Sequence, residues 1–212
     1  MCACILTKFK VIALEKTKEY LNFLPLPINI CDSKNNPIKL YPHQITTLTF
    51  MKERESLDSS SVYGLSGGII RLEMGLGKTL TAITHSLISP KKSNYPTLII
   101  ASKTLLTEWK TNGFEKFFDD RVKVLYLHEH YIKKSLLSTI NEKNICKYDF
   151  VVTTYDVCSV ACRMGGYCQK MEDYEGECNS NLGSGIDIIY KINWERIILD
   201  ESQKIANPDT WT

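Results

Sequence analysis

The sequence GGIIRLEMGLGKTL, residues 67–80, carries the strongest signal in the chain. It joins a short apolar segment, expected as a strand over 68–72, to an amphipathic segment expected as a helix over 78–89. Glycines between a strand and a helix let the backbone turn tightly, so that successive N–H groups can surround phosphate oxygens. The positive end of the following helix also attracts anions. The stretch therefore predicts a phosphate-binding loop of the short G-x-G-K-T form, with an ordinary glycine turn as the alternative.

Two side chains of this loop have the chemistry that a bound nucleotide requires. Lys78 is expected to reach the β- and γ-phosphates, and the Thr79 hydroxyl is expected to ligate Mg²⁺. The other nucleotide-binding positions lie in the loop and in the first helical turn: Met74, Gly75, Leu76, Gly77 and Leu80.

A second apolar run, residues 197–199, ends in Asp200 and Glu201. At the end of a buried strand, Asp200 would hold Mg²⁺, usually through water, and Glu201 would polarise the attacking water. An acidic pair after an apolar run is otherwise a solvated strand end. The long separation between Lys78 and Asp200 leaves room for several βα units, so we predict that both motifs belong to one site.

The rest of the chain has the texture of an α/β fold, in which strand-length apolar runs alternate with segments of helical period. The expected strands, besides 68–72, are 97–101, 122–127, 150–154 and 196–199. The expected helices, besides 78–89, are 11–23, 43–53, 104–118 and 131–140. We predict a parallel sheet flanked by helices over residues 37–212, preceded by an N-terminal extension and linker over 1–36 and interrupted by an irregular, cysteine-rich insertion over 156–192.

Composition limits the class of protein. The 212 residues are 43% hydrophobic and 24% charged, as in a soluble globular domain. No apolar run approaches the roughly 20 residues that span a bilayer, and the N-terminus does not resemble a secretory signal, so we expect an intracellular protein without a membrane partner. A net charge of +2 is too even to indicate nucleic acid by itself. Any nucleic-acid partner must follow from motifs.

Four of the eight cysteines fall in the insertion: Cys158, Cys162, Cys168 and Cys178. Zinc sites favour pairs spaced C-x₂₋₄-C, and only the first two cysteines fit that spacing. Zinc therefore stays possible here, and the alternative is a loop with reduced, unligated thiols.

Five segments in this order resemble the motifs of SWI/SNF-type DNA translocases, a branch of the superfamily two helicases. Residues 67–80 resemble motif I and residues 194–207 resemble motif II. Between them, residues 96–109 resemble motif Ia and residues 148–155 resemble the next motif. Upstream, residues 40–44 resemble the family's adenine-reading glutamine motif. Motif II departs from the family pattern, because Ser202-Gln203 stands where Ala-His is usual.

The resemblance implies an ATP-dependent motor on double-stranded DNA, built from two RecA-like lobes, of which this chain contains the first. It implies that Gln44 reads the adenine edge, and that the protein works at DNA, in a nucleus or at a viral replication site. It also implies that DNA phosphates are contacted by Ser102, Lys103, Thr104, Thr153 and Thr154. A hydroxyl before a helix can instead be only a helix cap.

Two further expectations concern what lies beyond motif II. The second lobe, with the arginine that stabilises the transferred phosphoryl group, is expected to be missing from these residues, so the alternative function is a nucleotide- or partner-binding fragment that is inactive alone. A small nucleotide kinase is excluded by the order of the motifs. The resemblance also implies that the motif III strand separates the strand at 69–70 from the strand at 197–199, so these two should not pair with each other.

Overall fold

The computed structural model describes residues 37–56, 67–132, 139–164 and 186–205. The chain divides into two compact units, Met1–Pro90 and Lys91–Thr212, which we describe in turn as unit 1 and unit 2. The expected boundary after residue 36 and the expected helix over 11–23 lie outside the described residues. No helix in the described ranges is long and apolar enough to cross a membrane.

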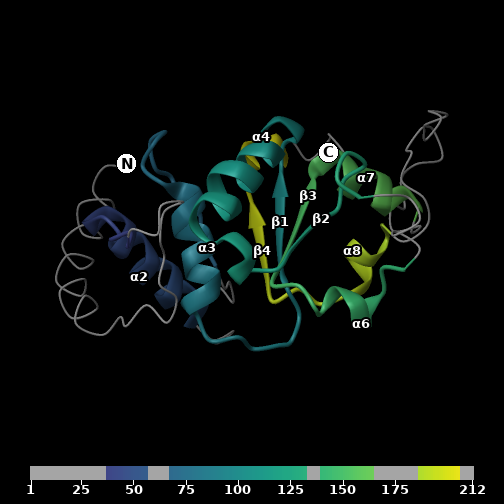
Figure 1. Cartoon of the computed structure of the whole chain (residues 1–212), viewed down its shortest axis with the longest axis horizontal. Coiled ribbons are helices and arrows are strands. Elements are labelled where there is room, and N and C mark those ends of the chain that lie inside the picture. The colour runs from purple at the N-terminus through teal and green to yellow at the C-terminus, as the bar shows by residue number, and fades with distance from the viewer. Residues whose placement is uncertain (1–36, 57–66, 133–138, 165–185, 206–212) are drawn as a thin grey trace, which may run out of the picture. The chain divides into compact units, whose positions relative to one another are not determined.

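The described residues of unit 1 form two helices that pack against each other, α2 (Pro42–Ser56) and α3 (Lys78–Ile88) (Figure 1). Both were predicted within a few residues. Leu48 of α2 and Ile83 of α3 are fully buried, as the apolar stripe of each helix requires. The helix α3 ends where Ser89 becomes extended, because Pro90 disfavours a helical conformation for the residue before it.

The prediction of a strand over residues 68–72 is wrong, because these residues form no strand in the structure. Ile69, which should have been buried in a sheet, is 86% exposed. An isolated strand cannot satisfy its own N–H and C=O groups, and no described residues pair with this segment.

Unit 2 is built on a four-stranded sheet in the order β2-β3-β1-β4, in which every pairing is parallel (Figure 1). The strands are β1 (Thr97–Ala101), β2 (Val124–Tyr126), β3 (Phe150–Thr154) and β4 (Arg196–Leu199). All four were predicted, and β2 is shorter than expected. Every residue of β3 is buried, which shows that helices cover both faces of the sheet at its centre.

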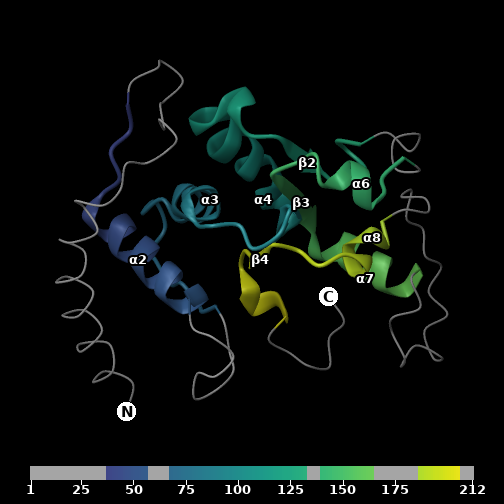
Figure 2. The ribbon, with the colours of Figure 1, turned by 90° about the horizontal axis from the view of Figure 1, so that it is seen from below.

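The helices of unit 2 connect these parallel strands. They are α4 (Lys103–Glu108), which continues into the π-helix Trp109–Glu115, then α6 (Glu142–Ile145), α7 (Tyr155–Met164) and α8 (Ile188–Lys191). Both α4 and α7 contact β3, and α7 lies beside α8 (Figure 2). The main core lies in this unit and is formed by residues such as Leu98, Leu127, Ile145, Val151 and Ile186.

Two expected helices and the expected insertion match the structure only in part or lie partly outside the described residues. The helix expected over 104–118 forms, but its second half is a π-helix. Most of the helix expected over 131–140 lies outside the described residues. The insertion expected to be irregular over 156–192 contains α7 and α8 at its two ends. Val157 and Ala161 are buried at helical spacing and form the apolar face of α7. This helix was not predicted, because the segment was interpreted from its cysteine content.

At one edge of the sheet, β4 pairs with β1 and with no other strand among the described residues. Ile197 is 58% exposed and Leu199 is 38% exposed along β4, although their neighbours in the strand are better covered. Residues 69–70 form no strand, so the expected separation of a strand at 69–70 from β4 stays a prediction.

Candidate nucleotide-binding site

The loop before α3 has the backbone conformation that the glycine pattern predicted. Gly75 and Gly77 have φ angles of 81° and 76°, in the left-handed region that favours glycine. The N–H of Leu76 donates to the Glu73 carbonyl at 3.4 Å, which closes a turn between them. Gly77 caps α3, and its carbonyl accepts from both the N–H and the hydroxyl of Thr81 at 3.0 Å. The loop therefore leads directly into a helix N-terminus.

The ammonium group of Lys78 lies over this loop. Its Nζ donates to the carbonyls of Leu72 at 2.9 Å and Glu73 at 3.2 Å. Phosphate oxygens that accept hydrogen bonds from the loop N–H groups would lie close to a cation held against the same loop. A Cβ added at Gly75 would meet no atom within 4 Å, so the loop is open there. These features fit the phosphates of a nucleotide.

Gln44, the expected adenine reader, is buried against the loop. Its Oε1 accepts from the Tyr41 N–H at 2.9 Å, and its Nε2 donates to the Leu76 carbonyl at 3.3 Å. His43 also contacts the Leu76 carbonyl, through Nε2 at 3.0 Å. Gln44 thus connects the start of α2 to the loop, which sequence analysis did not foresee. Its role toward adenine stays a prediction.

Asp200 follows β4 directly and is held at three atoms. Its N–H donates to the Ile100 carbonyl at 2.9 Å, which extends the pairing of β4 with β1. Its carbonyl accepts from the Tyr155 hydroxyl at 2.8 Å, and its Oδ2 accepts from the indole Nε1 of Trp109 at 2.8 Å. Burial, followed by the charge of Asp200, raises the pKa of Tyr155 to about 12, so this hydroxyl keeps its proton as the donor.

Glu201 is exposed and has an unusual backbone. Its φ of 53° lies in the left-handed region, and it is the one non-glycine residue with a positive φ in the described ranges. Such conformations are disfavoured for residues with a Cβ and concentrate at functional sites. The side-chain amide of Gln203 donates to Glu201 Oε2. The residue that departs from the family pattern therefore contacts the expected catalytic carboxylate.

Asp200 and Thr79 each have a side-chain oxygen of a kind that suits Mg²⁺, which prefers oxygen ligands such as carboxylates and water. In the described part of the chain, Asp200 Oδ1 has no hydrogen-bond partner, and neither has the hydroxyl of Thr79. Each unit therefore contributes one of the two side chains predicted to ligate the metal, and their meeting at one ion stays a prediction.

The residues expected at DNA phosphates divide into two groups. Lys103 and Thr104 are exposed at the start of α4, and the nearby Ser102 is buried, with its Oγ 3.0 Å from Thr104 Oγ1. Thr153 and Thr154 are fully buried. The Thr153 hydroxyl donates to the Leu127 carbonyl at 2.9 Å, and the Thr154 hydroxyl accepts from the Val157 N–H at 3.3 Å. Both are therefore placed as structural residues at the end of β3, and the structure does not present them to a ligand.

The four cysteines considered for zinc do not form a site in the described residues, where no cluster of metal-ligating side chains is found. Burial, followed by the charge of Asp156, raises the pKa of Cys158 to about 12, which opposes the thiolate form that binds metal. Cys162 is disulfide-bonded, which differs from the expectation of reduced thiols. Cys168 and Cys178 lie outside the described residues.

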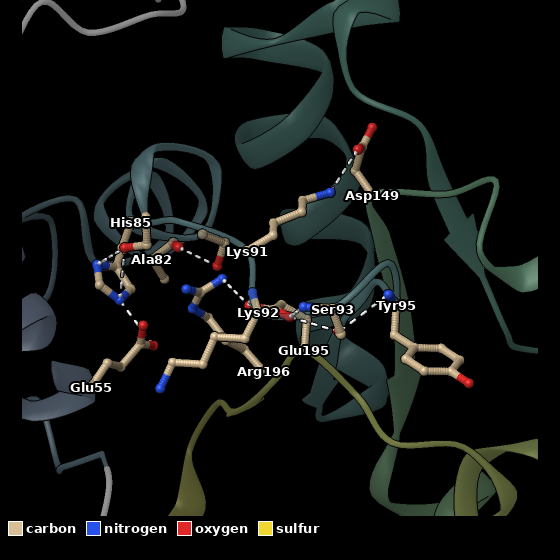
Figure 3. Close-up of polar contacts among 12 residues, drawn as sticks. Glu55, Ala82, His85, Lys91, Lys92, Ser93, Tyr95, Asp149, Glu195 and Arg196 are labelled. Atoms are coloured by element: carbon tan, nitrogen blue, oxygen red, sulfur yellow. Dashed lines mark hydrogen bonds and ion pairs between the residues drawn. The ribbon is translucent and has the colours of Figure 1, made fainter. Parts of the chain in front are cut away.

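Glu195 fixes the start of β4 to the segment before β1 (Figure 3). Its carboxylate accepts from the N–H groups of Lys92 at 2.9 Å and Ser93 at 2.7 Å, and from the Ser93 hydroxyl at 2.7 Å. Burial raises its pKa, but these hydrogen bonds and the nearby Arg196 outweigh burial and lower it. This buried anchor helps to hold the strand that delivers Asp200.

Comparison with known proteins agrees with this geometry. The SNF2-related domain family matches residues 43–212. The chain is 44% identical over 203 residues to "Putative helicase 172L" of Invertebrate iridescent virus 6, covering 84% of this chain and 33% of that protein. It is 31% identical over 175 residues to an uncharacterised ATP-dependent helicase of Schizosaccharomyces pombe, covering 81% of this chain and 15% of that protein.

Among solved structures, the SWI2/SNF2 ATPase core of Sulfolobus solfataricus in complex with dsDNA is similar, with a TM-score of 0.56 and 25% identity. The match covers 87% of this chain and 29% of that chain. The chain therefore spans about a third or less of these relatives. With a family match over most of its length and the RecA-like parallel sheet that the motifs predicted, this chain belongs to the SNF2-related domain family, as an N-terminal lobe.

Proposed function

We propose that this chain is the ATP-binding lobe of a DNA-dependent ATPase that couples ATP hydrolysis to movement on double-stranded DNA. The observation that carries the proposal is the phosphate loop, in which two left-handed glycines precede a helix and Lys78 lies over the loop carbonyls. Relatives named as helicases, and a similar ATPase core solved with dsDNA, support the choice of reaction and partner.

Each motif residue has a separate task in this proposal. Lys78 binds the β- and γ-phosphates in place of the loop carbonyls that it contacts here. Thr79 and Asp200 would supply oxygen ligands to Mg²⁺, and a bound Mg²⁺ would neutralise charge on the phosphate oxygens. Glu201 accepts a proton from the attacking water, and its exposed carboxylate is available for that role. Gln203 orients Glu201 through its amide.

For the DNA side, we propose contacts by Lys103 and Thr104, which are exposed, with Ser102 in support. Basic and hydroxyl side chains at the start of a helix are suited to phosphate oxygens. Contacts by Thr153 and Thr154 would require their buried hydroxyls to leave the partners described above. We place the protein at DNA inside the cell for the same reason that we propose DNA as its partner.

The proposal is tested by transplanting the lobe. We expect these 212 residues, exchanged for the matching segment of the iridescent-virus relative, to hydrolyse ATP faster when double-stranded DNA is added. In this chimaera, Glu201→Gln should preserve ATP binding and reduce turnover by about 10²-fold or more, because the water loses its general base.

Residues 1–212 alone should bind ATP with almost no turnover, because a missing arginine finger is worth about 10³- to 10⁵-fold. The unmodified relative is the control, and a chimaera whose turnover ignores DNA would contradict the proposal.

A further inference from the structure

Among the described residues, the carboxylate of Asp200 accepts one hydrogen bond, which comes from a distant part of the chain. Trp109 lies 91 residues earlier, and its indole Nε1 donates to Asp200 Oδ2 at 2.8 Å. The backbone on either side of this carboxylate is also fixed, by Ile100 at the N–H and by Tyr155 at the carbonyl. With the backbone held, the indole is the contact that decides how the carboxylate is rotated.

The indole is itself held in place by the core. Trp109 is 3% exposed, and its ring packs against Phe114 with centroids 6.3 Å apart. Phe114 in turn packs against Phe150 of β3 at 5.0 Å. Trp109 is also the first residue of the π-helix, a form that is rare and is often found at functional sites. A rigid ring supported by the sheet can hold its N–H in one direction.

We propose that Trp109 is a positioning residue for the metal ligand Asp200. Its N–H occupies Oδ2 and leaves Oδ1, which has no partner in the described part of the chain, as the oxygen that would ligate Mg²⁺. This inference rests on the proposed function, since it assumes that Asp200 binds the metal of a Mg²⁺–nucleotide complex. Partners that orient a metal ligand in this way are worth about 10- to 100-fold in metal affinity.

The alternative is that Trp109 is a core residue whose N–H found a convenient acceptor, as buried indoles usually do. Trp194 shows what that alternative looks like in the same unit. Its indole N–H is also partly buried and donates at 2.8 Å, but to the backbone carbonyl of Ile189. Trp194 therefore provides a matched control, because replacing it removes a similar hydrogen bond that does not touch Asp200.

The experiment measures how strongly Mg²⁺ is coupled to nucleotide binding in the full chain. Affinity for a fluorescent ADP analogue is measured at submicromolar protein over a series of Mg²⁺ concentrations, and with a chelator. We expect Trp109→Phe to raise the Mg²⁺ concentration for half-maximal coupling about 10- to 100-fold. Affinity without metal should be unchanged, and Trp194→Phe should behave as wild type in its Mg²⁺ response.

Two further variants separate positioning from folding. Benzothienylalanine at position 109 keeps the size of the ring and replaces the N–H with sulfur, so it should reproduce the effect of Trp109→Phe without a packing defect. Asp200→Asn should abolish most of the coupling, and adding Trp109→Phe to it should change nothing more, because Trp109 acts through Asp200.

The outcomes distinguish the role of Trp109 from the metal site itself. A normal Mg²⁺ response of the benzothienylalanine variant beside a normal wild type would overturn the role of Trp109 and leave the proposed function intact. An effect of Trp109→Phe that persists in full on top of Asp200→Asn would do the same. A wild-type chain that binds nucleotide without any response to Mg²⁺ would overturn the proposed metal site, and this inference with it.

Discussion

At the scale of single residues, the two left-handed glycines of the phosphate loop are not equivalent. A Cβ at Gly77 would lie 2.3 Å from Gln44 Nε2, whereas a Cβ at Gly75 would meet no atom within 4 Å. Both substitutions force a side chain into a left-handed backbone, at a cost of about 1–2 kcal/mol. Only Gly77→Ala also displaces Gln44 from its contacts with Tyr41 and Leu76.

We therefore expect Gly77→Ala to lower the free energy of unfolding by about 1–3 kcal/mol more than Gly75→Ala does, because two hydrogen bonds of Gln44 are lost in addition. Urea denaturation of the two variants beside wild type measures the difference. Gln44→Ala provides the control, since it removes the clash and should make the two glycine substitutions similar in their effect. Equal losses in the presence of Gln44 would show that the amide does not pack against the loop.

The sequence predicted the chemistry of individual residues better than their contacts. Roles for Lys78, Thr79, Asp200 and Glu201 could be proposed because each motif is a local pattern whose chemistry depends on neighbouring residues, and these roles stay predictions. The contact between Trp109 and Asp200 joins residues that no local pattern relates. The need of a buried indole for an acceptor was the available signal, but it does not identify the acceptor.

At the scale of elements, the strands were predictable and the helices less so. The apolar runs of β1, β3 and β4 are bounded by polar residues, and a parallel sheet covered on both faces leaves such runs little choice. The π-helix at 109–115 was not predicted, because such helices are rare and occur mostly as single turns inside α-helices. The segment at 68–72 failed as a strand because strand formation depends on a neighbour.

The helix α7 provides a test that also concerns zinc. With a pKa of about 12, the Cys158 thiol would be ionised in about one molecule in ten thousand at pH 8. We expect iodoacetamide to label Cys158 at least about 10²-fold more slowly than the partly exposed Cys146, with the rate rising as pH increases toward 12. Peptide mapping by mass spectrometry measures both rates in one sample. Fast labelling of Cys158, or about one equivalent of zinc in the purified chain, would contradict this assignment.

For the chain as a whole, the feature that most affects stability and aggregation is the open edge of β4. Ile197 and Leu199 are exposed there, and Ile69 is exposed in unit 1. Burying each large aliphatic side chain stabilises a protein by roughly 1.5–3 kcal/mol, so three of them represent a large part of a typical stability of about 5–15 kcal/mol. An exposed apolar edge strand is also a template for aggregation.

We therefore expect residues 1–212 alone to unfold over a broad range of temperature and to self-associate at high concentration. Light scattering and a circular dichroism melt measure both properties. Appending the segment of the viral relative that follows its aligned region should sharpen the thermal transition. A single sharp transition of a monomer, with 69–70 paired to β4, would contradict the strand order that the family resemblance implies.

Calorimetry of ATP binding to wild type and to Lys78→Ala shows whether residues 67–80 form a nucleotide phosphate site. The variant loses a charge-assisted contact worth about 1.5–3 kcal/mol, so its affinity for ATP should fall about tenfold to a hundredfold. Lys92→Ala, which removes an exposed lysine side chain outside the loop, should bind ATP as wild type does. Binding of ATP by Lys78→Ala as tight as that of the wild-type chain would contradict the assignment.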